Sequence, residues 1–572
     1  MICRSRCART ATLSTPASRR SSTPRAAWTS SVRSTPRRAA RGNLPFEAHR
    51  QVGPATDAEL RRPVIDLLPQ RVPVRRAPMG VASMRRTLAA VVACAAALGA
   101  ASCATNPESG THHVVFTSVK GEQERARRVH EEIKRFYGLY QDQALQDYVQ
   151  MVGTRVARNT PIADWDFKFF VLDDESINAF TIGGGYVYIH RGLLPYLNSE
   201  AELAAVLGHE IGHDVARHPA RSEARGVLLG TGALATAILT GNAALAEMAD
   251  LGATAWMQGY GRDQESEADR LGLEYAARSG YRPEAMGNAM KVFKAQESFE
   301  LTRAKDEGRD PNIYHGVFSD HPAPDERIVQ ATLGAANITS VPRGGWLDNR
   351  DEYLKAIDAL PFGSSREQGI VRDNRFYHAG MKLTMAFPKG WRVQNERDRL
   401  LITKKKELLM QLTVEKRPEK QSPREFLLQK LRGASISRGE ALAVAGMEGY
   451  AVITRSGSPL DGGEGPVRLA VLYRGSQAFV IGAASRSSQA GAPLDDGLFM
   501  SSIQTMRDMK PSEYPLAEPY RLKIIQATDA TRIDDYAKDM PVEKFKKEEL
   551  RLLNGLYPKG EARPGDFIKV VQ

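Results

Sequence analysis

The sequence predicts an α+β protein: a mainly helical first domain with a small edge-exposed sheet, then a small α+β domain and a short C-terminal unit. Three observations predict this class. Apolar residues recur at helical spacing over about 122–140 and 143–159. The segment 184–190 alternates its side chains as a strand does. Near residues 361–368 the composition becomes loop-like, and the segments that follow are short and β-rich.

The first 83 residues differ in composition from the rest of the chain. They hold 16 arginines, no lysine and four acidic residues, which accounts for the whole net charge of +12 and leaves 63 basic and 63 acidic residues elsewhere. Because no basic stripe is left to follow a phosphate backbone, we expect no nucleic-acid partner. Residues 1–83 are interpreted as a disordered or targeting segment, or as a spurious extension upstream of a natural start at Met84.

Residues 84–103 have the composition of a lipoprotein signal peptide. Arg85 and Arg86 precede an apolar run, 88–101, that is too short to span a bilayer comfortably. Cys103 is the last of four cysteines, and the residues before it resemble a lipobox. We therefore expect a periplasmic protein that is anchored to the outer membrane by a lipid on Cys103. Plain signal-peptidase cleavage nearby is the alternative.

Two strands are predicted early in the first domain, which we place at residues 104–358. They cover about 167–173 and 184–190. The second strand has two faces, with Tyr186, Tyr188 and His190 on one and Val187 and Ile189 on the other. His190 is expected to face solvent or the backbone of a substrate.

Helices make up the rest of the first domain. Ser199 and Glu202 have the spacing of a capping box, so a helix is expected to begin there. Further helices are expected at about 264–279 and 283–299. The stretch 226–257 is rich in Ala, Gly, Leu and Thr, but glycines and acidic residues interrupt it. A packed helical pair or a mobile cover over a cleft is favoured over a membrane-spanning helix.

The small α+β domain is placed at residues 370–508, and the C-terminal unit at 518–572. Expected strands are 381–387, 400–404, 409–415, 448–455, 467–474 and 478–483, and expected helices are 425–431 and 499–506. Short strands of this kind, with few helices between them, predict antiparallel pairing.

The central motif is a His-Glu-x-x-His sequence on the predicted helix that follows Ser199. His209 and His213 are four residues apart, so both imidazoles lie on one face and can bind one ion. Glu210 is one residue round the helix from His209. Its carboxylate can contact a metal-bound water rather than the metal, which makes it the predicted catalytic base.

A catalytic zinc ion needs a third protein ligand and a position left open for water. About 50 residues further on, Glu265 and Asp269 are again four residues apart on a predicted helix. Glu265 is the expected third ligand of one Zn²⁺ per chain. Asp269, which we group with the catalytic residues, is expected to accept the outer N–H of a ligand histidine. Glu267 is expected to be a solvated charge.

Two further histidines need separate interpretation. On a continuous helix His218 would lie on the side opposite His209, so we interpret it as a helix-end or outer residue rather than a ligand. His321 either approaches the metal, as a transition-state donor or an occluding ligand, or is structural.

Residues 104 to about 335 resemble the HtpX-like and BepA-like zinc metallopeptidases, metallopeptidase family forty-eight, related to the CAAX prenyl protease and the Oma-type mitochondrial proteases. The matching stretches, in the family's order, are Thr105-Asn106-Pro107, Ile177-Asn178-Ala179-Phe180, Gly184-Gly185-Tyr186-Val187-Tyr188, His209 to His218, Glu265 to Gly272, Asp320-His321-Pro322 and Arg327-Ile328. The resemblance implies a zincin-type, gluzincin fold with His209, His213 and Glu265 as zinc ligands and Glu210 catalytic.

The resemblance also implies an edge strand, at about Tyr186–His190, that binds an extended protein or peptide substrate as an added strand. The tetratricopeptide helices that many periplasmic members carry after the protease are not found here. The final unit is similar to a degenerate LysM module in segments 522–525, 553–556 and 564–566, which implies peptidoglycan contact. A simple β-α-β closing unit is the alternative.

The sequence thus predicts a zinc-dependent endopeptidase of the bacterial cell envelope that acts in protein quality control. The alternative of another class is an envelope chaperone-like or peptidoglycan-associated binding lipoprotein, with a closed or structural metal site. A mitochondrial protease is a second alternative, which the mature N-terminus would decide.

Overall fold

The computed structural model describes residues 103–105, 112–115, 117–229, 260–308, 311, 324–395, 399–404, 408–431, 435–454, 467–485, 496–542 and 544–572. Most of the predicted signal peptide, most of the stretch 226–257 and His321 lie outside the described residues. Near the start, β1 (Cys103–Thr105) pairs antiparallel with β2 (His112–Val114). No helix among the described residues is long and apolar enough to cross a membrane.

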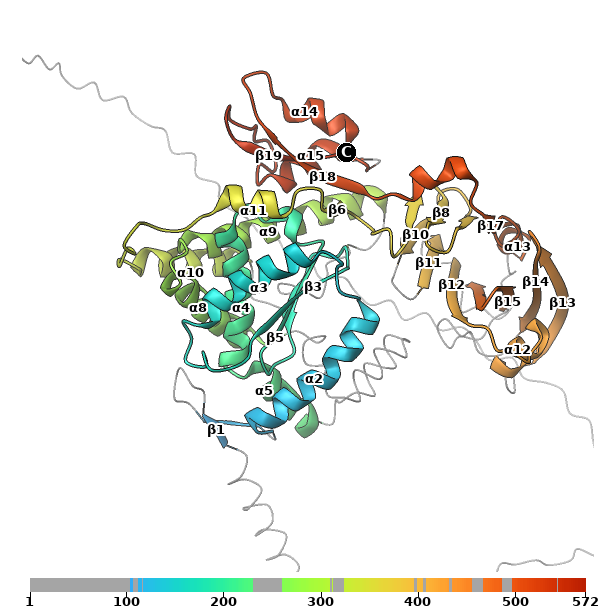
Figure 1. The fold of residues 1–572 in the computed structure, drawn as a ribbon, viewed down its shortest axis with the longest axis horizontal. Coiled ribbons are helices and arrows are strands. Elements are labelled where there is room, and N and C mark those ends of the chain that lie inside the picture. Colours follow the sequence, from blue (N-terminus) through green and yellow to red (C-terminus); the bar gives the residue numbers. More distant parts are fainter. Residues whose placement is uncertain are drawn as a thin grey trace, which may run out of the picture. The chain divides into compact units, whose positions relative to one another are not determined.

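A three-stranded sheet lies at the centre of the first domain (Figure 1). It consists of β3 (Lys168–Leu172), β4 (Ala179–Thr181) and β5 (Tyr186–His190), in the order β3-β5-β4. β5 is parallel to β3 and antiparallel to β4. The prediction that Tyr186–His190 is an edge strand is therefore wrong, because neighbouring strands occupy both sides of β5.

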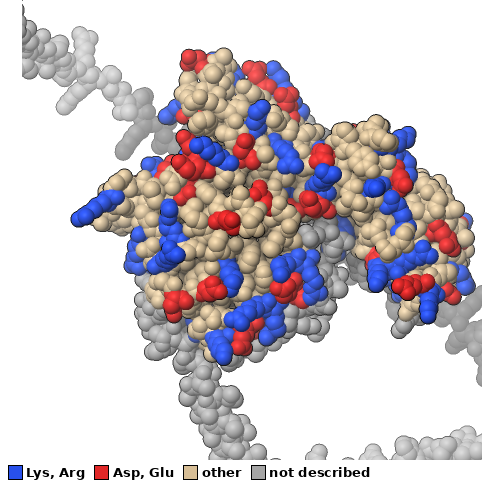
Figure 2. Space-filling model, viewed as in Figure 1, with Lys and Arg blue, Asp and Glu red and all other residues tan. Residues whose placement is uncertain are grey.

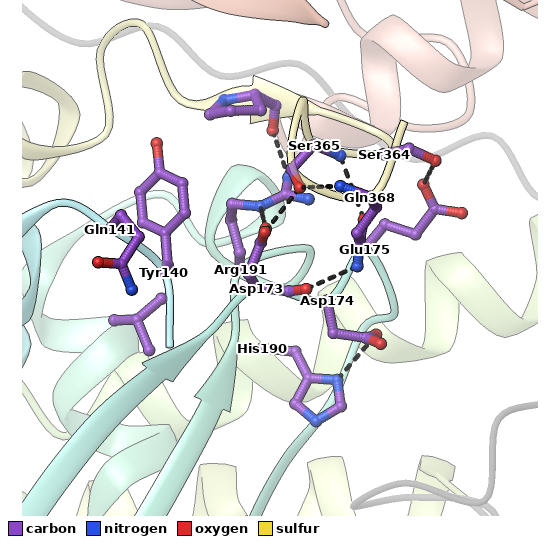
Figure 3. Close-up of polar contacts among 12 residues, drawn as sticks. Tyr140, Gln141, Asp173, Asp174, Glu175, His190, Arg191, Ser364, Ser365 and Gln368 are labelled. Atoms are coloured by element: carbon purple, nitrogen blue, oxygen red, sulfur yellow. Dashed lines mark hydrogen bonds and ion pairs between the residues drawn. The ribbon is translucent and has the colours of Figure 1, made fainter. Parts of the chain in front are cut away.

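Both faces of the sheet are covered. Tyr186 and Tyr188 pack against helix α2 (Val119–Phe136), while Val187 and Ile189 belong to the main core with α3 (Gln143–Ala157). The predicted alternation of faces is thus confirmed. His190 is only 2% exposed, which overturns its expected contact with solvent or substrate. Its Nδ1 atom instead lies 3.1 Å from Asp174 Oδ1 (Figure 3).

Side chains close the outer edge of β3. Gln146 of α3 accepts a hydrogen bond from the Val171 N–H and donates one to the Val171 carbonyl, each 2.9 Å long. One helical turn later, Gln150 accepts from the Phe169 N–H at 3.0 Å and donates to the Phe167 carbonyl at 3.1 Å. The two amides thus take the hydrogen bonds that another strand would make. Among the described strands of this sheet, only β4 keeps an unpaired edge.

Six helices follow the sheet among the described residues of the first domain, and two of them, α4 and α8, carry the spaced acids and histidines identified above. The six are α4 (Glu200–Val215), α5 (His218–Leu229), α8 (Arg262–Arg278), α9 (Glu284–Glu307), α10 (Pro324–Asn337) and α11 (Arg350–Ala356). The Ser199 side chain caps α4 by accepting from the Glu202 N–H. The buried Glu200 carboxylate accepts hydrogen bonds from four surrounding side chains: Tyr148, Arg155, Tyr281 and Asn349. These contacts hold the first turn of α4 in place.

Helices α4 and α8 lie side by side (Figure 1), and their backbones approach closely at three glycines. A Cβ atom on Gly272 would lie 2.6 Å from the backbone nitrogen of His209, and one on Gly208 would lie 2.9 Å from the Gly272 carbonyl oxygen. A Cβ on Gly212 would likewise lie 2.9 Å from the Ala268 carbonyl oxygen. Glycine is therefore required at this crossing, because any side chain would push the helices apart.

Residues 361–365, which follow α11, are hydrogen-bonded to residues at the ends of β3 and β5. The buried Arg191 side chain donates to Asp173 Oδ1 at 2.9 Å and to the carbonyls of Pro361 and Gly363. Ser365 donates to the other Asp173 oxygen at 2.6 Å. Figure 3 shows how these side chains converge on Asp173. The segment that leads into the second domain is thus bound to the first.

The second domain is antiparallel, as predicted. Its elements are β7 (Ile370–Arg372), β8 (Arg375–His378), β9 (Leu383–Ala386), β10 (Arg392–Asn395), β11 (Arg399–Lys404), β12 (Leu408–Lys416), α12 (Pro423–Lys430), β13 (Ile436–Val444), β14 (Met447–Thr454), β15 (Val467–Arg474), β16 (Gln477–Ser485), α13 (Asp496–Gln504) and β17 (Arg507–Asp508). They form a seven-stranded sheet, β10-β11-β12-β16-β15-β14-β13, and a four-stranded sheet, β17-β9-β8-β7.

The C-terminal unit packs into the core of the first domain. Its elements are β18 (Tyr520–Gln526), α14 (Ile533–Tyr536), α15 (Lys546–Leu553) and β19 (Phe567–Val571). β18 pairs with β19 and with β6 (Pro361–Phe362). The buried Lys569 Nζ donates to the Leu197 carbonyl at 2.7 Å. The apolar side chains of the C-terminal unit belong to the same hydrophobic cluster as those of the first domain, so the two parts share one core.

Charged side chains of both signs are interspersed on the face of the molecule shown in Figure 2. This mixture agrees with the balance of 63 basic and 63 acidic residues after residue 83.

We predict that Gly272→Ala destabilises the protein by about 1–3 kcal/mol or more, because the added methyl group meets backbone atoms of α4. Gly287→Ala in α9 is the matched control, since its nearest contact would be Thr332 Oγ1 at 3.8 Å. Removing a helical glycine there should be neutral or stabilising by up to about 1 kcal/mol. Denaturant unfolding measures both, and equal stabilities would contradict the argument.

Candidate metal centre

Three buried side chains from α4 and α8 converge on one point. His209 Nε2 lies 3.0 Å from His213 Nε2, and Glu265 oxygens lie 3.2 Å from the first atom and 3.4 Å from the second. The three residues form a group of donors able to hold a metal ion. The helical spacing of the histidines and the close crossing at Gly272 together produce this arrangement.

The donor set fits a zinc ion. Two nitrogen ligands about 2.0–2.1 Å from a tetrahedral zinc lie roughly 3.3 Å apart, which is close to the three separations observed. Two imidazoles and one carboxylate are also the ligands of many catalytic zinc sites, which keep one further position for water.

The outer nitrogen of His209 is held by a carboxylate. His209 Nδ1 lies 2.9 Å from Asp269 Oδ1, and the Arg327 guanidinium of α10 donates to both Asp269 oxygens, at 2.5 and 2.6 Å. Burial opposes ionisation of Asp269, but hydrogen bonds from His209 and Arg327 outweigh it and lower the Asp269 pKa to about 2. This contact fixes which way the His209 ring faces.

Protonation of His209 is linked to metal binding. Burial lowers its pKa, but hydrogen bonds to Asp269 and Glu265 outweigh burial and raise the pKa to about 10 in the metal-free site. Since an imidazolium cannot coordinate a metal, binding of an ion releases this proton.

The outer nitrogen of His213 is held by a second histidine. His213 Nδ1 lies 2.8 Å from His218 Nδ1, and His218 Nε2 lies 3.1 Å from Glu267 Oε2. Burial lowers the His218 pKa to about 4, so this imidazole is neutral at pH 7. A neutral His218 that donates to Glu267 accepts from the His213 Nδ1–H, which leaves the Nε2 lone pair of His213 available to a metal ion.

Glu210 lies beside the three donors and is 2% exposed. Burial raises the Glu210 pKa to about 8. The nearby His209 and a hydrogen bond from the Thr181 backbone both act against this rise. The carboxylate therefore faces the end of β4. A buried carboxylate with a pKa near neutrality is suited to accepting a proton and passing it on.

The Tyr260 ring covers the other side of His213. The two ring centroids lie 4.0 Å apart with an interplanar angle of 22°. Tyr260 therefore restricts the tilt of the imidazole by packing.

The structure brings together five of the six site residues that the sequence predicts: His209, Glu210, His213, Glu265 and Asp269. His321 lies outside the described residues. Glu267 is not the solvated charge that we expected, because it contacts His218 and Arg221. His218 has the outer position predicted for it.

Sequence reasoning assigned no role to Arg327, Thr181 or Tyr260. Arg327 could have been noticed as a basic residue within the matching stretches. Thr181 and Tyr260 carry no local signal, because only the packing of distant segments brings them to the metal centre.

Residues 143–333 match the model of Peptidase family M48. This segment is an M48 metallopeptidase domain. The resemblance found in the sequence is thereby confirmed. All the site residues named above, from Thr181 to Arg327, lie within the M48 domain.

Two curated relatives share this similarity. The chain is 30% identical over 213 residues to the beta-barrel assembly-enhancing protease of Yersinia pestis, covering 36% of this chain and 42% of the relative. It is 37% identical over 199 residues to the putative beta-barrel assembly-enhancing protease of Vibrio cholerae, covering 33% and 39%. The matches thus span less than half of each relative.

A solved structure, the solution structure of cyanobacterial PsbP from Synechocystis, aligns with 24% of this chain and 95% of its own. The identity is 11% and the TM-score 0.19, which is too low to support an argument.

We predict that the purified protein binds one zinc ion and that His209→Ala or Glu265→Ala abolishes binding, because each removes a donor. Asp269→Asn keeps the donors but removes the charge behind His209, and should weaken zinc binding by about 10–100-fold. Glu274→Gln is the control, because Glu274 is a half-buried carboxylate on the same helix as Asp269 that pairs with Arg270 and Arg278 instead of the donors. Elemental analysis and chelator competition give the values; wild-type protein without stoichiometric zinc would refute the site.

Proposed function

We propose that this protein is a zinc-dependent endopeptidase of the bacterial cell envelope that acts in protein quality control. The observation that carries the proposal is the convergence of His209, His213 and Glu265 with the Glu210 carboxylate beside them. A structural metal site does not require a buried carboxylate next to its donors. A hydrolytic site does, because a proton must be moved during peptide-bond cleavage.

In the proposed mechanism each residue has one task. A bound zinc ion supplies Lewis acidity, which polarises the substrate carbonyl and acidifies water. Glu210 accepts the proton of the attacking water and transfers it to the leaving amine. Asp269 and His218 keep the His209 and His213 rings in orientation, and Arg327 holds Asp269.

The substrate is proposed to be an extended polypeptide that pairs with β4, in place of the expected pairing at Tyr186–His190. Hydrogen bonds from His190 to Asn178 and from Ile182 to Tyr186 fix the alternation along this strand. The backbone groups of Ala179 and Thr181 consequently point away from β5, toward the side where Glu210 lies. Glu210 accepts a hydrogen bond from the Thr181 N–H, so the Ala179 N–H and carbonyl and the Thr181 carbonyl are the groups proposed to pair with an added strand.

A cavity of about 470 Å³ is lined by Ile177, Arg327 and residues of α9 that include Met290, Phe293 and Glu297. Neither the three donors nor Glu210 or Thr181 is among its lining residues, so we do not assign it to the substrate.

An envelope location is proposed from two observations. The segment 84–103 has a lipoprotein signal pattern, and the relatives named above are beta-barrel assembly-enhancing proteases. We propose a periplasmic protein anchored to the outer membrane through Cys103. The β18-α14-α15-β19 order of the last unit is compatible with a LysM-like module that contacts peptidoglycan.

The competing proposal is an envelope chaperone-like or peptidoglycan-associated binding lipoprotein whose metal site is structural or closed. Such a protein would bind the same polypeptides without cleaving them. The two proposals therefore differ in one measurable property, which is turnover.

We predict that Glu210→Gln abolishes cleavage of an unfolded protein substrate while zinc remains bound, because the amide cannot accept the proton. Proteolysis is followed by gel and mass spectrometry, and zinc by elemental analysis. Cleavage by the variant at the wild-type rate would rule out the assigned base. A wild type that binds substrate and zinc but never cleaves would favour the binding lipoprotein.

We predict that the mature protein begins at Cys103 and carries a diacylglyceryl group on its sulfur. Mass spectrometry of the N-terminal peptide from membrane fractions measures this. Cys103→Ser should release the protein from the membrane. An unmodified N-terminus elsewhere in the chain would remove the lipid anchor from the proposal.

A further inference from the structure

Thr181, the last residue of β4, is bound by two carboxylates of α4. Glu210 accepts a hydrogen bond from its backbone N–H, and Asp214 Oδ1 accepts one from its hydroxyl at 2.6 Å. Glu210 and Asp214 are four residues apart, so they lie on the same face of the helix. Helix α4, which carries the proposed base Glu210, therefore also binds the Thr181 side chain of β4.

The second oxygen of Asp214 binds the turn between β4 and β5. It accepts a hydrogen bond from the Gly185 N–H at 2.8 Å. The Gly183 N–H donates to the Thr181 hydroxyl oxygen at 3.1 Å, which closes the network. Residues 183, 184 and 185 have φ values of 84°, 66° and 86°, a left-handed path that favours glycine. Asp214 thus fixes the turn from both sides.

Burial makes this network specific. Asp214 is 2% exposed and Thr181 is fully buried. Buried polar groups that lose a partner are costly, so β4 cannot slide along α4 without leaving unpaired N–H groups behind. The carboxylate therefore determines one position of the strand rather than a range of positions.

We propose that Asp214 is a positioning residue, which holds the free edge of β4 so that a polypeptide paired with it places its scissile bond opposite Glu210. This inference rests on the proposed peptidase function and goes beyond it, since Asp214 touches neither the donors' metal-facing atoms nor the substrate. A displacement of about 1 Å in a bound chain can reduce turnover by roughly 100-fold.

The consequence is a dependence on substrate length. A long peptide pairs with the outward backbone groups of Ala179 and with the Thr181 carbonyl once this buried edge is uncovered, and it follows the strand when the strand shifts. A short peptide, which spans only the residues next to the scissile bond, makes few contacts with β4 and is held mainly at the metal centre. Loss of the network should therefore penalise the long peptide more.

The test uses the full-length protein and four variants. Asp214→Asn removes one acceptor while keeping the side-chain size. Thr181→Val removes the hydroxyl while keeping the β4 backbone, and Thr181→Ser restores the hydroxyl. Tyr148→Phe is the matched control, because it removes one hydroxyl contact to buried Glu200 at the far end of α4. Cleavage of a long and a short fluorogenic peptide, zinc content and thermal unfolding are measured for each.

We expect Asp214→Asn and Thr181→Val to lower kcat for the long peptide by about 10–100-fold, and to lower it several-fold less for the short one. Zinc content should stay at the wild-type value. Thr181→Ser should recover most of the rate lost in Thr181→Val. Tyr148→Phe should alter both peptides by the same factor.

Equal losses for both peptides in Asp214→Asn and Thr181→Val would overturn the inference, as would no loss in either. Asp214 would then only stabilise the fold. Should Asp214→Asn fail to fold, Thr181→Val and its serine rescue decide alone. Failure of the proposed function gives a different result, in which the wild type cleaves neither peptide or Glu210→Gln cleaves both.

Discussion

The contact between α4 and α8 is the constraint on which the metal centre depends. His209 and His213 share a helix face because of local geometry, but Glu265 reaches them only because the two backbones almost touch. A side chain at residue 272 would lie 2.6 Å from the backbone nitrogen of His209. The separations of 3.2 and 3.4 Å between Glu265 and the two histidines could not survive even a modest widening of the crossing. Gly208, Gly212 and Gly272 thus determine where the three candidate donors meet.

The same crossing concentrates negative charge in the interior. Glu210, Asp214, Glu265 and Asp269 are all buried within the M48 domain. Arg327 offsets part of this charge, and protonated His209 offsets more in the metal-free site. Buried charges are costly unless they are paired. A divalent cation would complete the balance, so metal binding and stability of the domain are expected to be coupled.

The proposed substrate binding depends on which sheet edge has no neighbouring strand. Two glutamines of α3 occupy the outer edge of β3, and β4 covers one side of β5, so the outer edge of β4 remains and faces Glu210. The polar network at Asp214 then joins that edge to the helix that carries Glu210, the proposed base. Hydrogen bonds therefore hold β4 against α4, whereas close packing of α4 and α8 brings the donors together.

The parts of the candidate site that depend on local spacing were predictable from the sequence alone. Histidines and acids four residues apart share a face of a helix, so the pairs at 209/213 and 265/269 could be identified without a structure. The alternation of Tyr186 and Val187 was predictable for the same reason. Strand order, the partner of Glu267 and the burial of His190 depend on segments far apart in the chain. Only the tertiary structure decided that β5 is central, that Thr181 lies against α4, and that the C-terminal unit shares the core of the first domain. The physical reason is that a spacing rule describes one element, while pairing and packing describe relations between elements.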